Sequence, residues 1–184
     1  HWGFAGISNL NQSDFWGSKI TCTSSRGFTG ALPIAESAVG AIFMFTRQLQ
    51  VSVQQTSRMK FDATEYQPVL TSGKTIGIIG LGGIGSQLAR LAKSVGMRVL
   101  ATRLSVTTKT NEVNFVDTLY PANEMETMLP ECDFVVVCAM WTSETEKLIN
   151  EHASHAMKEN TYIINIARGE LIDEVNMFVD GCSD

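Results

Sequence analysis

The chain has 184 residues, 44% of them hydrophobic, and a formal net charge of -5 at pH 7. This size fits one domain, or one domain with part of another. The mild acidity gives no electrostatic reason to expect a nucleic-acid partner. No stretch approaches the roughly 20 apolar residues that a membrane span needs, and we see no secretory leader. None of the four cysteines forms a C-x-x-C pair, and we expect a protein of the reducing cytoplasm. Because no span or leader is visible, we expect no membrane partner.

The first part of the chain is predicted to hold a short strand and one long helix. Residues 19–23 (KITCT) have the composition of a strand. Residues 33–56 are predicted to form the helix, and Pro33 suits its start because the missing N–H costs nothing there. Residues 57–74 are polar and mixed, which indicates a segment crossing between two units. Apolar residues recur in the helix at spacings of three and four, at Ile34, Ala38, Ala41, Phe45 and Leu49.

From Thr75 onward, apolar strand patterns alternate with helical patterns. Parallel strands need crossover connections of helix length, so this alternation predicts a parallel sheet. Residues 73 to about 174 are therefore predicted to form a doubly wound α/β unit. A further strand between Val113 and Tyr120 is only weakly indicated. The clear strands are expected in segments 75–80, 97–102, 133–139 and 161–167, with helices at 84–95, 122–132 and 144–158.

A glycine fingerprint, G-x-G-x-x-G, follows the first of these strands at Gly80, Gly82 and Gly85. Gly80 permits the tight turn, Gly82 lets a pyrophosphate approach the backbone, and Gly85 lets helix and strand pack closely. The phosphates would then lie over the free N–H groups of the helix that begins near Ile84. A strand before the motif and a helix after it favour a dinucleotide site over a glycine-rich turn without a ligand.

The second strand ends in ATRLS, with Arg103 at the position where an NAD site usually has an acidic residue. An arginine there can pair with the 2′-phosphate of NADP, helped by the hydroxyl of Thr102 or Ser105. The alternative is a solvated arginine beside an NAD site. We therefore predict a nicotinamide dinucleotide cofactor, with NADP preferred to NAD.

The segment INIARGELIDE, residues 164–174, places Arg168 just beyond the last predicted strand. Ligands of open α/β sheets bind beyond the carboxyl ends of the strands, and an arginine fork there can hold a substrate carboxylate. The alternative is a surface ion-pair residue. His152 and His155 have a spacing that fits two metal ligands, but a solvated helix face explains it better, so we predict no metal site.

These motifs, in this order, resemble the D-isomer-specific 2-hydroxyacid dehydrogenases. GKTIGIIGLGGIG, DFVVVCAMWTSETEKLIN and INIARGELIDE carry most of the likeness, and WGFAGISNL and SSRGFTGALPIAES extend it to nearly the whole chain up to about Glu174. The family has two Rossmann-like domains, with the nucleotide domain inserted within the substrate domain. The resemblance thus implies the end of a partial substrate domain at 1–32, a linking helix and crossing segment at 33–72, and a nucleotide domain at 73–184.

The resemblance also implies a reaction, which is reversible hydride transfer between the nicotinamide and a 2-oxo acid or D-2-hydroxy acid, of the glyoxylate or hydroxypyruvate reductase kind. Arg168 matches the catalytic arginine that orients the substrate. Ala5 and Gly6 match the loop that holds the substrate carboxylate. The family's Pro-containing loop is replaced here by CAMWTSET. The cofactor contacts expected from the residues and the resemblance are Gly80, Gly82, Gly83, Ile84, Gly85, Thr102, Arg103, Ser105, Ala139, Ile166 and Ala167.

The family also uses a histidine as proton donor, supported by a glutamate. Their positions fall beyond the last residue, and the family pattern fades near Val175, so we expect a truncated chain that is inactive alone. A non-catalytic regulatory module on the same fold is the alternative function. Members of the family commonly form dimers through the nucleotide domain and the linking helices, which implies a homodimer.

Overall fold

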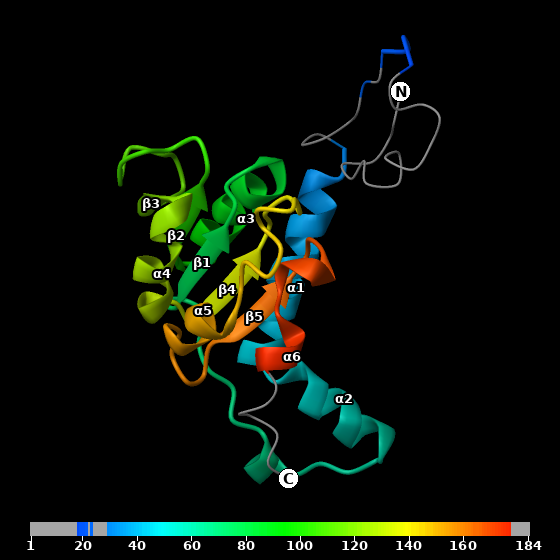
Figure 1. Cartoon of the computed structure of the whole chain (residues 1–184). Coiled ribbons are helices and arrows are strands. Elements are labelled where there is room, and N and C mark those ends of the chain that lie inside the picture. The colour runs from blue at the N-terminus through cyan, green and yellow to red at the C-terminus, as the bar shows by residue number, and fades with distance from the viewer. Residues whose placement is uncertain (1–17, 22, 24–28, 178–184) are drawn as a thin grey trace.

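The structure is a computed structural model, and it describes residues 18–21, 23 and 29–177 (Figure 1). The predicted carboxylate loop at Ala5 and Gly6 lies outside the described residues, as does most of the predicted 1–32 segment. The division into domains therefore remains a prediction. No helix within the described ranges has the length and apolar character needed to cross a membrane.

A five-stranded sheet forms the centre of the molecule, and all of its neighbouring strands are parallel. The strand order is β3-β2-β1-β4-β5, so the chain reverses direction across the sheet after β3. This is the predicted doubly wound α/β class. The strands are β1 (Thr75–Ile79), β2 (Arg98–Arg103), β3 (Thr118–Pro121), β4 (Phe134–Val137) and β5 (Tyr162–Asn165).

Helices cover both faces of this sheet, which explains why the strands are apolar on both sides. Ile78 and Val136 point into a core with helices α1 and α3, whereas Ile79 and Val137 point into a core with α4 and α5. The α-helices are α1 (Ala31–Thr46), α2 (Leu49–Ser57), α3 (Gly83–Ser94), α4 (Met125–Met128), α5 (Glu151–His155) and α6 (Glu174–Met177). The 3-10 turns are η2 (Ala63–Glu65), η3 (Ala122–Glu124), η4 (Leu129–Glu131) and η5 (Gly169–Leu171).

The prediction of one continuous helix over 33–56 is wrong, because the helix is interrupted at Arg47 and Gln48. Gln48 adopts a left-handed conformation with φ 49°. The carbonyl of Thr46 accepts a hydrogen bond from Val69 N–H at 2.7 Å, and the Thr46 hydroxyl meets the Thr71 hydroxyl at 2.8 Å. The crossing segment thus takes over a carbonyl that a continuing helix would use, and α2 lies away from the sheet (Figure 1).

The face that α1 buries coincides only in part with the apolar residues that recur in the sequence. Its fully covered residues form a stripe of small side chains and one isoleucine, which lets α1 approach the sheet and α3 closely. Ala38 belongs to this stripe, and Ala41 and Phe45 are partly buried against the same core. Leu49, however, is exposed and lies in α2. The buried stripe is Ala31, Ala35, Ala38, Ile42 and Thr46.

Three other predicted elements are shorter or absent. The described residues of the predicted 19–23 strand, 19–21 and 23, are not in a strand. The 122–132 helix is divided into η3, α4 and η4. Of the 144–158 helix only α5 forms, because Lys147 has φ 53° and Ile149 instead pairs with Ile172 in an isolated bridge. The weakly indicated strand is β3, which covers only the end of its predicted segment.

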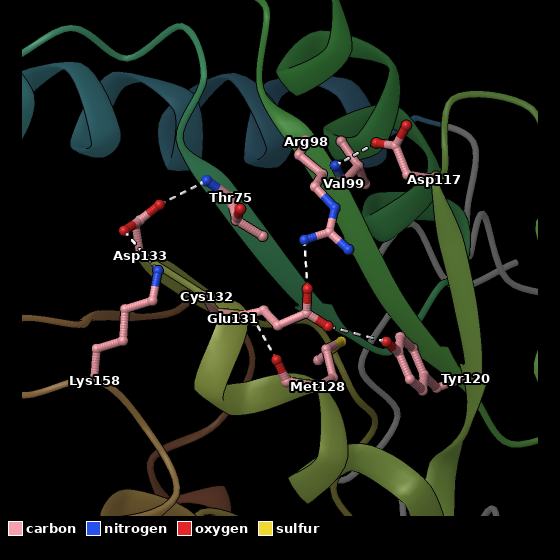
Figure 2. Close-up of polar contacts among 10 residues, drawn as sticks. All are labelled: Thr75, Arg98, Val99, Asp117, Tyr120, Met128, Glu131, Cys132, Asp133 and Lys158. Carbon is pink, nitrogen blue, oxygen red and sulfur yellow. Dashed lines mark hydrogen bonds and ion pairs between the residues drawn. The ribbon is translucent and has the colours of Figure 1, made fainter.

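Two carboxylates fasten the amino ends of the central strands (Figure 2). Asp133 accepts hydrogen bonds from Thr75 N–H at 2.8 Å and from Lys158 Nζ at 2.9 Å. Asp117 similarly accepts from Val99 N–H and from Lys93 Nζ, both at 2.7 Å. The first N–H group of β1 and the second N–H group of β2 are therefore bound at the end of the sheet opposite to the glycine turn.

The bond network of Asp133 predicts a pH-dependent contribution to stability. Burial raises the pKa of Asp133, but the Thr75 N–H bond and the Lys158 ammonium outweigh it and hold that pKa below 3.8. A lowered carboxyl pKa stabilises the fold above the unfolded-state pKa, and this stabilisation is lost as the pH falls through the folded-state pKa. Asp133→Asn should therefore cost about 1 kcal/mol at pH 7, and this cost should decrease as the pH falls through the folded-state pKa.

Urea unfolding at several pH values measures this difference. Glu159→Gln, at an exposed carboxylate beside Lys158, serves as the control and should change little at any pH. An Asp133→Asn cost that stays constant between pH 7 and pH 2 would contradict the prediction.

Candidate dinucleotide site

The carboxyl ends of four strands lie level with one another across the sheet. Ile79 pairs with Thr102 on one side and with Val137 on the other, and Val137 pairs with Asn165. The loops that follow these residues therefore leave the sheet at one edge. They include the glycine turn, the Arg103 turn, the Ala139 loop and the Arg168 loop. The glycine turn lies where the strand order reverses, between β2 and β4, which is where ligands of open α/β sheets bind.

The glycine turn is hydrogen-bonded to β2 on one side and lies against the loop after β4 on the other. Gly80 has φ +100°, and its N–H donates to the Thr102 hydroxyl at 3.2 Å. Leu81 N–H donates to the Thr102 carbonyl at 2.8 Å. A Cβ on Gly80 would lie 2.9 Å from the Ala139 backbone. A side chain at residue 80 is therefore excluded by its conformation and by the neighbouring loop, as expected for a tight turn.

The other two glycines of the fingerprint differ in what surrounds them. A Cβ on Gly85 would overlap the Gly80 carbonyl oxygen and lie 3.2 Å from Ile78 Cγ2, so Gly85 permits the close packing of α3 on β1. A Cβ on Gly82 would meet nothing within 4 Å. No packing within the described residues requires a glycine at position 82. The absence of a side chain there leaves open space above the backbone.

This open space fits a pyrophosphate. Gly82 is the N-cap of α3, and no side chain caps that helix end. The first N–H groups of a helix have no partners within it, so those at Gly83 and Ile84 are suited to an anion. A Cβ at residue 82 would partly fill the space where the anion would sit.

The polar residues at the end of β2 and just after it do not all have the role that the sequence suggested. Thr102 is buried and its hydroxyl accepts from Gly80 N–H, so it supports the turn and has no surface to offer a ribose. Arg103 and Ser105 are exposed. Val106 N–H donates to the Arg103 carbonyl at 3.3 Å, which bends the chain after Arg103. Only Arg103 and Ser105 remain candidates for direct contact with a 2′-phosphate.

The loop after β4 is shaped by one threonine. The Thr145 hydroxyl donates to the Met140 carbonyl at 2.8 Å and accepts from Thr142 N–H at 2.8 Å. Met140 is 52% exposed, although it follows a buried strand. Burial raises the pKa of the Cys138 thiol to about 12, so this cysteine stays protonated and packs against the core as a hydrophobic residue.

The loop after β5 presents Arg168 at the surface. Ile166 N–H donates to the Val137 carbonyl at 3.3 Å, which extends the sheet pairing by one step. The Arg168 guanidinium donates to the Ala167 carbonyl at 2.9 Å. The two histidines of α5 are also exposed, and no group of three metal-ligating side chains occurs within the described residues.

Sequence reasoning did not assign a role to two residues that shape these loops, Asn165 and Thr145. Asn165 is the last residue of β5, and its amide bonds two backbone groups of the Arg168 loop. A polar residue that ends an otherwise apolar strand is a sequence signal for such a role.

A doubly wound parallel sheet with a tight glycine turn at its reversal point and a free helix end beside it defines a nucleotide-binding α/β protein. The comparisons with known proteins make this assignment specific. The family model for the D-isomer specific 2-hydroxyacid dehydrogenase NAD binding domain matches residues 39–179. The chain belongs to the D-isomer specific 2-hydroxyacid dehydrogenase family, whose members are oxidoreductases that use a nicotinamide dinucleotide.

Individual relatives are similar to parts of this chain. Glyoxylate reductase of Pyrococcus horikoshii is 42% identical over 104 residues, which is 55% of this chain and 29% of that protein. Hydroxypyruvate reductase of Thermotoga maritima is 28% identical over 94% of this chain and 54% of its own length. The crystal structure of a family protein from Aeromonas salmonicida superposes with a TM-score of 0.81 at 27% identity, covering 95% of this chain and 54% of that one. The chain thus spans about half or less of the relatives it matches.

Proposed function

We propose that this chain contributes the cofactor half of an NADPH-dependent reductase that acts on glyoxylate, hydroxypyruvate or a similar small 2-oxo acid. The observation that carries the proposal is the exposed Arg168, held at the same sheet edge as the glycine turn. The similarity to a glyoxylate reductase and a hydroxypyruvate reductase supports the substrate class. The exposed Arg103 at the end of β2 supports NADP over NAD.

In this proposal each loop has a distinct task. The N–H groups of Gly83 and Ile84 bind the pyrophosphate, and Arg103 with Ser105 binds the 2′-phosphate. Ala139, Ile166 and Ala167 line the cofactor, whose nicotinamide supplies the hydride when bound. Arg168 holds the carboxylate of the 2-oxo acid and polarises its carbonyl. The planar guanidinium carries several N–H donors in a rigid fork, so it can bond both groups. Of the remaining cofactor-site residues, Gly80 and Thr102 maintain the turn and Gly85 permits the packing of α3 on β1. Gly82 leaves space over the backbone for the pyrophosphate.

The test is ligand binding by calorimetry, first with NADPH and then with oxamate, a small 2-oxo carboxylate that resists reduction. Arg168→Lys keeps the charge but loses the fork, so oxamate should bind the NADPH complex about tenfold more weakly. The affinity for NADPH should change less than about twofold, because Arg168 is assigned to the substrate.

Arg90→Lys, at an exposed arginine of α3, is the matched control and should leave both affinities unchanged. Oxamate binding that survives Arg168→Lys would contradict the substrate role. Binding of NADPH without any binding of oxamate would instead favour the non-catalytic dinucleotide-binding module.

We also propose that the chain forms a homodimer through the α2 arm, defined as residues 49–70. Several large apolar side chains of this arm are exposed, and such patches on soluble proteins mark interaction surfaces. Val53→Glu combined with Phe61→Glu should convert a dimer to a monomer, as measured by sedimentation velocity. A dimer that persists in this variant would place the interface elsewhere. The exposed apolar residues of the arm are Leu49, Val53, Met59, Phe61, Val69 and Leu70.

A further inference from the structure

The backbone of the Arg168 loop is bonded twice by one side chain. The Asn165 amide nitrogen donates to the Arg168 carbonyl at 2.7 Å, and the Asn165 amide oxygen accepts from Ala167 N–H at 3.0 Å. Asn165 is the last residue of β5 and pairs with Val137 of β4, so the amide is attached to the rigid sheet. A short loop fixed at both of these groups has little freedom to rotate its peptide planes.

These two bonds also fix the position of the Arg168 backbone, from which the side chain extends. Arg168 has an extended backbone, with φ -142° and ψ 144°, and the 3-10 turn η5 begins at the next residue. Leu171 N–H donates to the Arg168 carbonyl at 3.2 Å, so that oxygen accepts both from the turn and from Asn165. Leu171 is completely buried, which anchors the far side of the loop. Arg168 is therefore an exposed side chain on a backbone fixed from both directions.

We infer that Asn165 is a positioning residue, whose amide fixes the backbone of Ala167 and Arg168 and thereby the direction in which the guanidinium faces a substrate carboxylate. This inference rests on the proposed function of Arg168. The asparagine amide is required because it donates at one end and accepts at the other. Aspartate keeps the acceptor for Ala167 N–H but places an oxygen against the Arg168 carbonyl. Alanine removes both bonds.

The experiment compares Asn165→Ala and Asn165→Asp with the unmodified chain, and uses three measurements. These are hydrogen exchange at the Ala167 amide, the affinity for NADPH, and the affinity of the NADPH complex for oxamate. Asn160→Ala is the matched control, because Asn160 is an exposed asparagine just before the opposite end of the same strand.

Asn165→Ala should speed exchange of the Ala167 amide about tenfold and weaken oxamate binding about tenfold or more, because a carboxylate fork tolerates little misplacement. Asn165→Asp should weaken oxamate binding to a similar extent while it largely preserves the protection of the Ala167 amide. In both variants the affinity for NADPH should stay within about threefold. The Asn160→Ala control should leave all three measurements unchanged.

Two results would overturn the inference. One is unchanged Ala167 exchange in Asn165→Ala, and the other is a loss of NADPH affinity as large as the loss of oxamate affinity, which indicates general damage to the site. If the unmodified chain binds NADPH but no oxamate, the substrate role of Arg168 fails. The exchange measurement then decides alone whether Asn165 fixes the loop.

Discussion

Gly82→Ala is expected to leave the fold intact and to weaken NADPH binding strongly, whereas Gly85→Ala is expected to destabilise the fold itself. The two glycines are three residues apart in one motif, but their surroundings differ. A methyl group on Gly85 overlaps the Gly80 carbonyl oxygen, which belongs to the backbone and cannot move aside cheaply. We expect a loss of about 2–3 kcal/mol, against the gain of about 1 kcal/mol that alanine usually gives within a helix.

The same methyl group on Gly82 meets no protein atom within 4 Å. Gly82 has φ -93° and ψ -157°, an extended backbone with negative φ that does not require glycine. The free energy of unfolding should therefore change by less than about 0.5 kcal/mol. If the pyrophosphate lies over this backbone, however, the methyl group occupies its space, and the affinity for NADPH should fall about thirtyfold or more.

Urea unfolding and NADPH titration of both variants separate the two roles. Gly40→Ala serves as a control within α1, since a Cβ there also meets nothing within 4 Å and no ligand is expected nearby. Normal NADPH affinity in the Gly82→Ala variant would mean that the cofactor does not cover this turn. A stable Gly85→Ala variant would mean that α3 can move away from β1.

Arg103→Asp is expected to reverse the cofactor preference. The unmodified chain should bind NADPH more tightly than NADH, because Arg103 at the end of β2 and Ser105 just after it are exposed and can surround a 2′-phosphate. An aspartate at this position repels the 2′-phosphate and accepts from the free ribose hydroxyls of NADH. The ratio of the two dissociation constants should shift about a hundredfold. This corresponds to the loss of a strong charge-assisted hydrogen bond and the addition of charge repulsion between the aspartate and the 2′-phosphate.

The titrations should be made at low and high salt. The advantage of NADPH in the unmodified chain should decrease at high salt, because Arg103 is exposed and its charge is screened. Arg90→Asp, at an exposed arginine within α3, controls for the change in net charge and should leave the ratio nearly constant. Equal affinity for the two cofactors in the unmodified chain would show Arg103 to be merely solvated.

Thr102 illustrates how neighbouring residues of one motif acquire different roles. In a strand, successive side chains point to opposite faces, and Thr102 is buried where Arg103 is exposed. The sequence pattern predicted that Thr102 and Arg103 both lie beside the ribose, because the pattern does not show which face of β2 meets the glycine turn. The hydrogen bond from Gly80 N–H to the Thr102 hydroxyl shows that this side chain stabilises the turn.

The sequence by itself determined the parallel sheet, the position of the glycine turn and the family. These features depend on local patterns, since strands buried on both faces must be apolar throughout and a tight turn must use glycine. The order of short strands and helices then restricts the topology. The resemblance identified the family from three motifs, each of which covers all or the end of a strand and the loop that follows it.

The tertiary structure decided where helices end and which loop residues support the site. The spacing of apolar residues continues through Arg47 and Gln48, yet the helix is interrupted there because Val69 binds the Thr46 carbonyl. Residues far apart in the chain likewise pair at Ile149 and Ile172, which prevents the longer helix predicted before α5. Local patterns cannot reveal such bonds, because their partners lie more than twenty residues away.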